Sequence, residues 1–362
     1  MELRSPTSEA LLRPSGAGHD TERLSTWDDY PVHQVPAPLS RVQPELLGFA
    51  ERFYFNLLRP TGEIAAVIGG GVYPLRGVSE CYFCRFDGDR QINVRAWSDL
   101  PAPDAAAVPG PFSFRCDTPL RDWSVAVDVE GARFSGRFAG LAPPFLYSVL
   151  DIPATEPGGV YDLYRHFVAV GRWDLEDFPG SGREFIGVRD RTWGVRSRRI
   201  RMHNWYVFWL ADRCLTLIHQ ELADGSEFFS EAGAVHADGR EERLRVTGHD
   251  LRYDPSTREV VAGTIALESD AGPLRLEYER VGRAMRLAGA GYDDRQGARD
   301  HDQGVEQDEY DLADPEVARH TGRGTMDAGA VGRVSGAWSA EGIGVVETAI
   351  ARDHVHYGGQ IA

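Results

Sequence analysis

The chain has 362 residues, a hydrophobic content of 42%, a net charge of −16 and a sequence pI near 5.1. This length and apolar content allow one large domain or two medium domains with a substantial core. The acidic balance argues against a nucleic-acid partner and against an anionic membrane surface, because both require a basic face. All the basic side chains are arginine, so Schiff-base lysine chemistry is excluded.

Composition and hydrophobic patterning also indicate the cellular compartment and the kinds of secondary structure. Frequent glycine (40) and proline (21) favour many turns over long helices. The four cysteines are too few for a disulfide-rich scaffold and predict reduced, structural thiols. The first residues lack a signal-peptide pattern, and no run of about 18 apolar residues predicts a membrane helix. We therefore expect a cytoplasmic protein without membrane insertion, as a monomer or a homodimer.

Residues 1–40 are polar and aperiodic and predict a flexible N-terminal arm. Alternating apolar and polar residues then predict short strands separated by turns. Before residue 150 the expected strands are 53–58, 63–72, 81–86, 91–97, 112–116, 123–129 and 133–138. Later expected strands are 164–170, 184–188, 205–210, 214–221, 227–235, 242–247, 251–253, 259–267, 274–278, 336–338 and 342–350.

The spacing of these strands, roughly 8–12 residues with turn signals between them, predicts an all-β sandwich or barrel. Prolines and glycines at 140–160 predict a linker between two β domains, 41–150 and 151–362. Residues near 292–323 are acidic and polar and predict a surface insertion or lid in the second domain. Two barrels and one twisted pair of sheets both fit this pattern.

Residues 187–196, GVRDRTWGVR, predict a charged turn bounded by glycines. In one interpretation Asp190 is an ionised base or electrostatic group whose pKa the neighbouring arginines lower. In the other, an Arg–Asp bridge pins a strand corner, Trp193 covers it and Gly194 supplies an unusual backbone angle. Both interpretations stay open at this stage.

The next segment, 202–209, is the most aromatic in the chain. Strand alternation places His203, Trp205 and Trp209 on one face and Tyr206 and Phe208 on the other. If the tryptophan face looks into a barrel, it would line an apolar pocket for a flat or polyene ligand and could stabilise a carbocation. His203 would then be an acid or base near neutral pH. A plain barrel core with a structural histidine is the alternative.

Motifs for cofactors and metals are weak. The glycines at 69–71 lack the strand–GxGxxG–helix context of a dinucleotide site, and there is no GxSxG motif. His354 and His356 form a same-face pair that would need a third metal ligand, and His219 and His236 are isolated in sequence. We expect neither a cofactor nor a metal.

Several of these features together resemble the carotenoid 1,2-hydratase/AttH-like superfamily, in its uncharacterised bacterial branch. They are Arg165-His166-Phe167, the 187–196 motif, the tryptophan-rich strand and the Asp224-Gly225 turn. The family motif is of the type RDHSWG; Asp190, Trp193 and Gly194 match it, while Arg191 and Thr192 replace its histidine and serine. The resemblance implies two lipocalin-like β-barrel halves in tandem and cofactor-independent hydratases or cyclases.

We therefore expect an enzyme that hydrates, dehydrates, isomerises or cyclises an apolar polyene, terpenoid or polyketide-type molecule, including by Diels–Alder-type cyclisation. The expected catalytic residues are Asp190 and His203. The expected substrate-binding residues are Trp193, Trp205, Trp209, Arg196 and Tyr164. Two alternatives remain: a pericyclase that works by folding its substrate without an acid or base, and a non-catalytic binder of lipophilic ligands.

Overall fold

The computed structural model describes residues 24–30, 49–99, 110–152, 162–179, 184–195, 199–254, 259–287, 303–317 and 326–361. Regular structure in these residues is almost entirely strand. Its helices are short: η1 (Thr26–Asp29), η4 (Pro74–Arg76) and α3 (Gly358–Ile361) are examples. No helix among the described residues is both long enough and apolar enough to cross a membrane. The predicted all-β fold is confirmed.

The first unit is a twelve-stranded antiparallel sheet in the order β18-β4-β3-β2-β1-β11-β10-β7-β6-β5, with β8 and β9 also paired to β10. Its strands are β1 (Ala50–Leu58), β2 (Ile64–Tyr73), β3 (Val78–Asp87), β4 (Arg90–Asp99), β5 (Phe112–Thr118), β6 (Asp122–Val127), β7 (Phe134–Gly140), β8 (Phe145–Leu146), β9 (Leu150–Ile152), β10 (Asp162–Asp177), β11 (Phe185–Val195) and β18 (Gly304–Asp311). Gly110 and Gly131, beside β5 and β7, lie next to Val305 and Gln307 of β18, so the two edges of the sheet approach each other. We call this unit the curled sheet.

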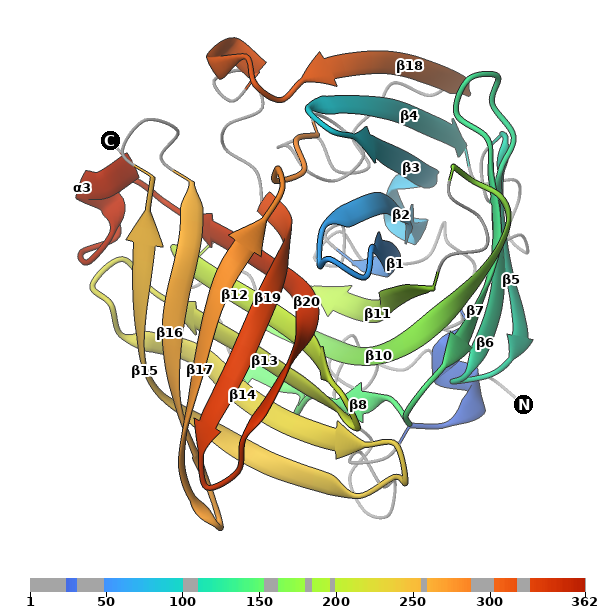
Figure 1. Cartoon of the computed structure of the whole chain (residues 1–362). Coiled ribbons are helices and arrows are strands. Elements are labelled where there is room, and N and C mark those ends of the chain that lie inside the picture. The colour runs from blue at the N-terminus through green and yellow to red at the C-terminus, as the bar shows by residue number, and fades with distance from the viewer. Residues whose placement is uncertain are drawn as a thin grey trace, which may run out of the picture.

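The second unit is a closed eight-stranded barrel in the order β12-β13-β14-β15-β16-β17-β19-β20. Its strands are β12 (Met202–Leu210), β13 (Arg213–Glu221), β14 (Glu227–His236), β15 (Glu241–Tyr253), β16 (Val260–Ser269), β17 (Gly272–Val281), β19 (Met326–Gly336) and β20 (Ala340–Ile350). Figure 1 shows this barrel beside the curled sheet. The architecture is two barrel-like halves in tandem, one closed and one open, as the resemblance implied.

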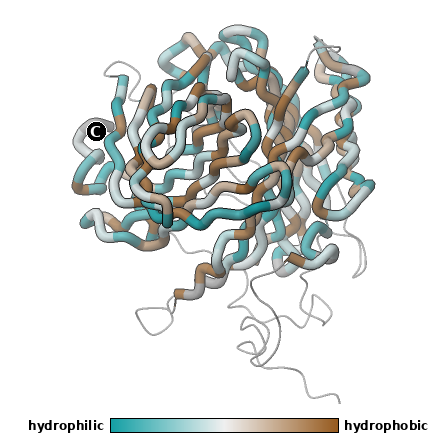
Figure 2. The backbone as a smooth tube through the Cα atoms, turned by 60° about the horizontal axis from the view of Figure 1, so that its bottom comes forward, coloured by the Kyte–Doolittle hydropathy of each residue, from teal (hydrophilic) through white to brown (hydrophobic). Residues whose placement is uncertain are grey.

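Alternation along the strands divides the apolar residues among four clusters, of which three are large. In β1, Phe53 and Phe55 point into the curl of the sheet and pack in one cluster. Tyr54 points the other way, into a cluster that it shares with Trp205 of the barrel. Tyr206, the next residue after Trp205, belongs to a third cluster that fills the barrel interior. The two units therefore meet through their outer faces, and Figure 2 shows hydrophobic segments gathered along the strands inside the body.

The described strands correct three expectations about the chain's organisation. Strands β8 and β10, on either side of the expected boundary at residue 150, belong to the same sheet. The change of sheet lies between Val195 and Met202. Part of the expected acidic insertion forms β18, which pairs with β4 at the edge of the curled sheet. The expected strand 336–338 is largely the turn between β19 and β20, because pairing ends at Gly336.

The N-terminal arm was expected to be flexible, but its described part is firmly packed. Asp29 in η1 is fully buried. Its carboxylate accepts hydrogen bonds from the backbone N–H of Leu120, at 2.5 Å, and from Nε1 of Trp123, at 3.0 Å. Residues 24–30 therefore attach to the curled sheet through a buried polar contact.

Candidate active site

The charged motif is a strand, so the predicted turn is wrong. Strand β11 runs through it in the middle of the curled sheet, and Asp190 pairs with Tyr54 of β1 and Val168 of β10. Because side chains alternate along a strand, Asp190 and Thr192 face the closed barrel. Arg189, Arg191 and Trp193 occupy the opposite face.

The arginines of the motif bind partners other than Asp190. Arg189 forms a fully buried ion pair with Asp29. Arg191 donates from Nη2 to Oε2 of Glu51, at 2.8 Å, and both side chains are 1% exposed. Both proposed Arg–Asp190 arrangements are therefore wrong, because alternation directs these side chains away from Asp190.

Trp193 also lies on the buried face of β11. Its ring packs edge-to-face on Phe167, with centroids 6.2 Å apart, and the Arg165 guanidinium lies 5.7 Å from its centroid. It does not line the cavity described below, so the expected substrate contact of Trp193 is not seen. Arg196, also expected to bind substrate, lies outside the described residues.

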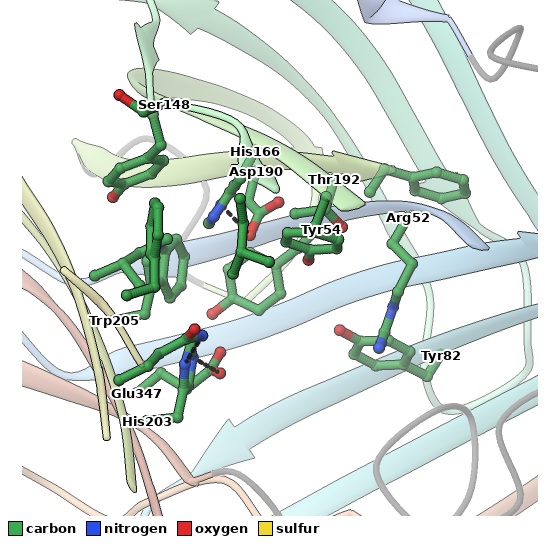
Figure 3. A pocket seen from close by; sticks show the side chains of 17 residues that line it. Arg52, Tyr54, Tyr82, Ser148, His166, Asp190, Thr192, His203, Trp205 and Glu347 are labelled. Carbon is green, nitrogen blue, oxygen red and sulfur yellow. Dashed lines mark hydrogen bonds and ion pairs between the residues drawn. The ribbon is translucent and has the colours of Figure 1, made fainter. Parts of the chain in front are cut away.

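A cavity of about 100 Å³ lies between the curled sheet and the outer face of the barrel. On the same measure, one water molecule needs roughly 10–15 Å³, so the cavity holds a ring-sized group. The side chains lining it from the curled sheet include Arg52, Tyr54, Tyr82, Tyr147, Ser148, Tyr164, His166, Asp190 and Thr192. Those from the barrel are His203, Trp205, Ile218, Gln220, Phe229 and Glu347. Figure 3 shows both sets converging.

The wall formed by the curled sheet contains an imidazole–carboxylate pair. Nε2 of His166 in β10 lies 2.9 Å from Oδ2 of Asp190, and the two side chains are 8% and 15% exposed. This Nε2 has no aligned hydrogen bond, and a small rotation of the ring would turn the close contact into one. The ring of His166 packs against Tyr147, at 4.7 Å between centroids, and against Trp205 of the barrel, at 5.8 Å.

The barrel wall contains a second pair. Nε2 of His203 lies 2.9 Å from Oε1 of Glu347 in β20, and Nδ1 of His203 lies 2.8 Å from the side-chain Nε2 of Gln220. The Gln220 amide donates to Nδ1, which places the proton of a neutral His203 on Nε2, toward Glu347. Both ring nitrogens of His203 then have hydrogen-bond partners. In this arrangement His203 orients Glu347, whose carboxylate lines the cavity with it.

A third carboxyl group lies behind Glu347. Asp327 in β19 pairs with Glu347 across the ladder and is fully buried. Burial, and then the negative charge of Glu347, raise the pKa of Asp327 well above its usual range. The protonated form of Asp327 is therefore favoured. Two adjacent carboxyl groups that share one proton are a common source of general-acid chemistry.

Three tyrosines add neutral hydroxyl groups. Burial raises the pKa of Tyr54 and of Tyr147 well above the usual value, so both hydroxyls stay protonated. Tyr82 reaches the cavity across β2 because Gly69 has no side chain; a Cβ there would lie 2.5 Å from the Tyr82 hydroxyl oxygen. Gly69, one of the three glycines that were predicted not to bind a dinucleotide, therefore leaves the space that the Tyr82 ring occupies.

Four of the expected site residues meet at this cavity: Asp190, His203, Trp205 and Tyr164. Trp205 does so from the outside of the barrel, so the expectation that it lines a barrel lumen is wrong. Trp209 shares the face of Trp205, as predicted, and packs against the same core without lining the cavity. His166 was missed as a site residue because its partner Asp190 lies on a neighbouring strand, and only the register of β10 with β11 reveals the pair.

Fold and cavity define the class of protein: an all-β chain of two barrel-like units, with an aromatic cavity containing carboxylates and histidines between them. Residues 24–139 match a protein family described as a family of unknown function, DUF8625. That match spans η1 to β7 and covers less than half of the chain. No curated protein matches the chain.

Two solved structures are similar in overall chain path. Kievitone hydratase from Nectria haematococca is 10% identical, with a TM-score of 0.45, over 86% of this chain and 92% of that one. An AttH-like protein from Nitrosomonas europaea is 13% identical, with a TM-score of 0.46, over 90% of this chain and 99% of that one. At these values neither likeness bears on the reaction of this chain.

Proposed function

We propose that this protein is an acid–base enzyme that adds water to a carbon–carbon double bond, removes water to form one, or moves one. The observation that carries the proposal is a pair of imidazole–carboxylate groups on the two walls of one cavity, His166–Asp190 and His203–Glu347. Hydration and its reverse both need a proton supplied at one point and removed at another. Groups on two walls can perform these two transfers on one bound molecule.

The proposed base is His166. Asp190 holds the imidazole through Nε2 and stabilises the imidazolium that forms when Nδ1 takes a proton. The proposed acid is the Glu347–Asp327 pair, in which burial and the charge of Glu347 raise the pKa of Asp327 and favour its protonated form. During hydration, water loses a proton to His166 and its oxygen bonds to carbon, while the acid pair protonates the neighbouring carbon. Dehydration reverses both transfers.

The charges around the cavity favour a reaction with a developing positive charge. Two carboxylates, Asp190 and Glu347, line it against one guanidinium, that of Arg52. The ring of Trp205 adds a π-face, which stabilises cations. Protonation of an electron-rich alkene creates such a cation. The same charges disfavour an anionic substrate, because it would approach two carboxylates.

The proposed substrate is a neutral, unsaturated molecule whose reacting end fits the cavity and carries an oxygen atom. The tyrosine hydroxyls and Ser148 supply hydrogen bonds for such an atom. A volume of about 100 Å³ admits one end of a terpenoid, polyketide or polyene chain and not its full length. The substrate expected from the sequence, an apolar polyene, terpenoid or polyketide-type molecule, remains part of this proposal.

The test is a screen for proton transfer in deuterated water. Purified protein is incubated with isoprenyl phenols, the corresponding tertiary alcohols and β-hydroxy ketones, and products are followed by NMR. We expect hydration, dehydration or deuterium incorporation for at least one class. Asp190→Asn should reduce that rate by about 100-fold or more. Trp193→Phe, on the opposite face of the same strand, is the matched control and should keep the wild-type rate.

Binding without chemistry has a different outcome. A carrier would quench tryptophan fluorescence with these compounds, lose that response in Trp205→Phe, and return every compound unchanged and free of deuterium. That result would contradict the enzyme proposal. Turnover that is equal in wild type and in Asp190→Asn, with a rate sensitive only to the size of residue 205, would instead favour a pericyclic role.

A further inference from the structure

A cluster of histidines closes one end of the barrel, away from the cavity between the units. In β13, Leu215 and Leu217 point into the barrel core, so alternation places His219 and Glu221 on the same inner face. Strand β15 adds His249 from the neighbouring wall. The segment that follows β20 folds over this end, where the Val355 N–H donates to the Ala223 carbonyl oxygen at 2.9 Å.

Three imidazoles in this cluster point the same ring nitrogen at one carboxylate. Nε2 of His219 and Nε2 of His249 lie 2.9 and 2.7 Å from Oε1 of Glu221. Nε2 of His354 lies 2.9 Å from Oε2 of Glu221. The side chains of His219, Glu221, His249 and His354 are 8%, 7%, 10% and 0% exposed. This is a buried cluster with nitrogen and oxygen donors from three separate parts of the chain.

We propose that His219, His249, His354 and Glu221 form a structural site for a first-row divalent metal ion, with Zn²⁺ as the expected occupant. Three imidazoles and a carboxylate are a complete donor set for tetrahedral zinc. The ligand atoms of His219, Glu221 and His249 all lie within 4.8 Å of one another. Tetrahedral bonds of about 2.0–2.1 Å separate donors by roughly 3.3 Å, so closing these three groups on an ion requires side-chain shifts of up to about 1.5 Å. His354 joins them through its contact with Oε2 of Glu221.

The groups around the cluster also fit ligation. Nδ1 of His219 lies 2.9 Å from Oγ of Ser230, and Nδ1 of His249 lies 2.8 Å from the hydroxyl of Tyr357. Each hydroxyl oxygen can accept the Nδ1 proton, and that tautomer leaves the Nε2 lone pair free for a metal.

The proposed ion would fasten the C-terminal segment to the barrel. His219 and Glu221 lie on one barrel strand and His249 on another, while His354 belongs to the segment outside the barrel. His356, two residues further on, is exposed. In this proposal His354 does not bind together with His356, its same-face neighbour in sequence, but joins histidines that are distant in sequence.

The experiment uses the full chain, stripped with a chelator and dialysed. Metal content is measured by mass spectrometry before stripping, and Zn²⁺ and Co²⁺ are then titrated in. We expect one equivalent of either ion, visible absorption from tetrahedral Co²⁺, and a rise in Tm on the order of 5 °C with excess Zn²⁺. His354→Gln should weaken binding by about tenfold or more and lose most of that rise.

His356→Gln is the matched control, because it changes the neighbouring, exposed histidine and should bind as wild type does. Tyr357→Phe removes one outer hydrogen bond and should weaken Zn²⁺ by roughly tenfold. Wild-type protein that binds neither ion at one equivalent overturns the proposal and identifies a hydrogen-bonded cluster. Binding that His354→Gln and Tyr357→Phe leave unchanged, or that His356→Gln abolishes, also overturns it.

Discussion

Strand β11 places two kinds of charge on its two faces. On the buried face, Arg189 and Arg191 are paired with Asp29 and Glu51, which come from outside the motif and hold the N-terminal segment and β1 in place. On the cavity face, Asp190 has His166 as its partner and stays 15% exposed. The two faces therefore differ in burial: a fully buried charge must be paired, whereas the proposed role of Asp190 requires the partial exposure that its side chain keeps.

The largest expected difference between the faces is in turnover. His166→Gln removes the proposed base while keeping a polar side chain of similar size, so the rate should fall by about 100- to 10,000-fold. Unfolding free energy, measured with urea, should change by less than about 1 kcal/mol. A His166→Gln protein with normal turnover would show that the cavity face is as structural as the buried one.

Substitutions on the buried face of β11 should mainly lower the free energy of unfolding. Asp29→Ala leaves the Arg189 guanidinium buried without its partner, which typically costs about 3–5 kcal/mol. The double variant Asp29→Ala/Arg189→Met should recover part of this loss, because it removes the uncompensated charge. Asp28→Ala, which loses a hydrogen bond from the Ser25 N–H and an electrostatic interaction with Arg165, is the partly exposed control and should cost under about 1 kcal/mol. Equal costs for Asp28 and Asp29 in urea unfolding would refute the division between the faces.

The cavity face also depends on the space that Gly69 leaves for Tyr82. Gly69→Ala places a Cβ against the tyrosine ring and should destabilise the protein by about 1–3 kcal/mol. Gly248→Ala, where a Cβ meets nothing within 4 Å, is the control and should be neutral within about 1 kcal/mol. Thermal unfolding of both variants, and of Gly69→Ala combined with Tyr82→Leu, measures the effect. A Gly69→Ala protein as stable as Gly248→Ala would show that Tyr82 has another conformation available.

The smallest expected effect is on the pH dependence of stability. Because the pKa of Asp327 is raised in the folded protein, the folded chain keeps a proton that the unfolded chain releases above about pH 4. This group's contribution to stability is therefore full below pH 4 and declines as the pH rises toward the raised value. Asp327→Asn mimics the protonated form and should flatten that decline, with a gain of about 1 kcal/mol or more at pH 8. An unchanged pH profile in urea unfolding would mean that Asp327 is ionised in the fold.

Much of the local structure follows from the sequence. Alternation predicted most of the strands, and it placed Trp205 and Trp209 on one face and Tyr206 on the other. The same rule would have separated Asp190 from Arg189 and Arg191, had residues 187–196 been assigned to a strand. Their two glycines favoured a turn instead. Gly187 sits in the strand because the Trp173 indole occupies the space of a side chain, a contact that local patterning does not show.

The sequence by itself determined the all-β class, the strand faces and the residue types that could carry chemistry, because these depend on alternation and composition within short segments. Only the tertiary structure decided which residues act together. Register across β10 and β11 joined His166 to Asp190, and packing of the two units outer face to outer face brought His203 and Trp205 to the same cavity. Barrel closure brought His219 and His249 to Glu221, and the segment after β20 added His354. These contacts join residues on different strands and segments, and no local pattern records which strands become neighbours.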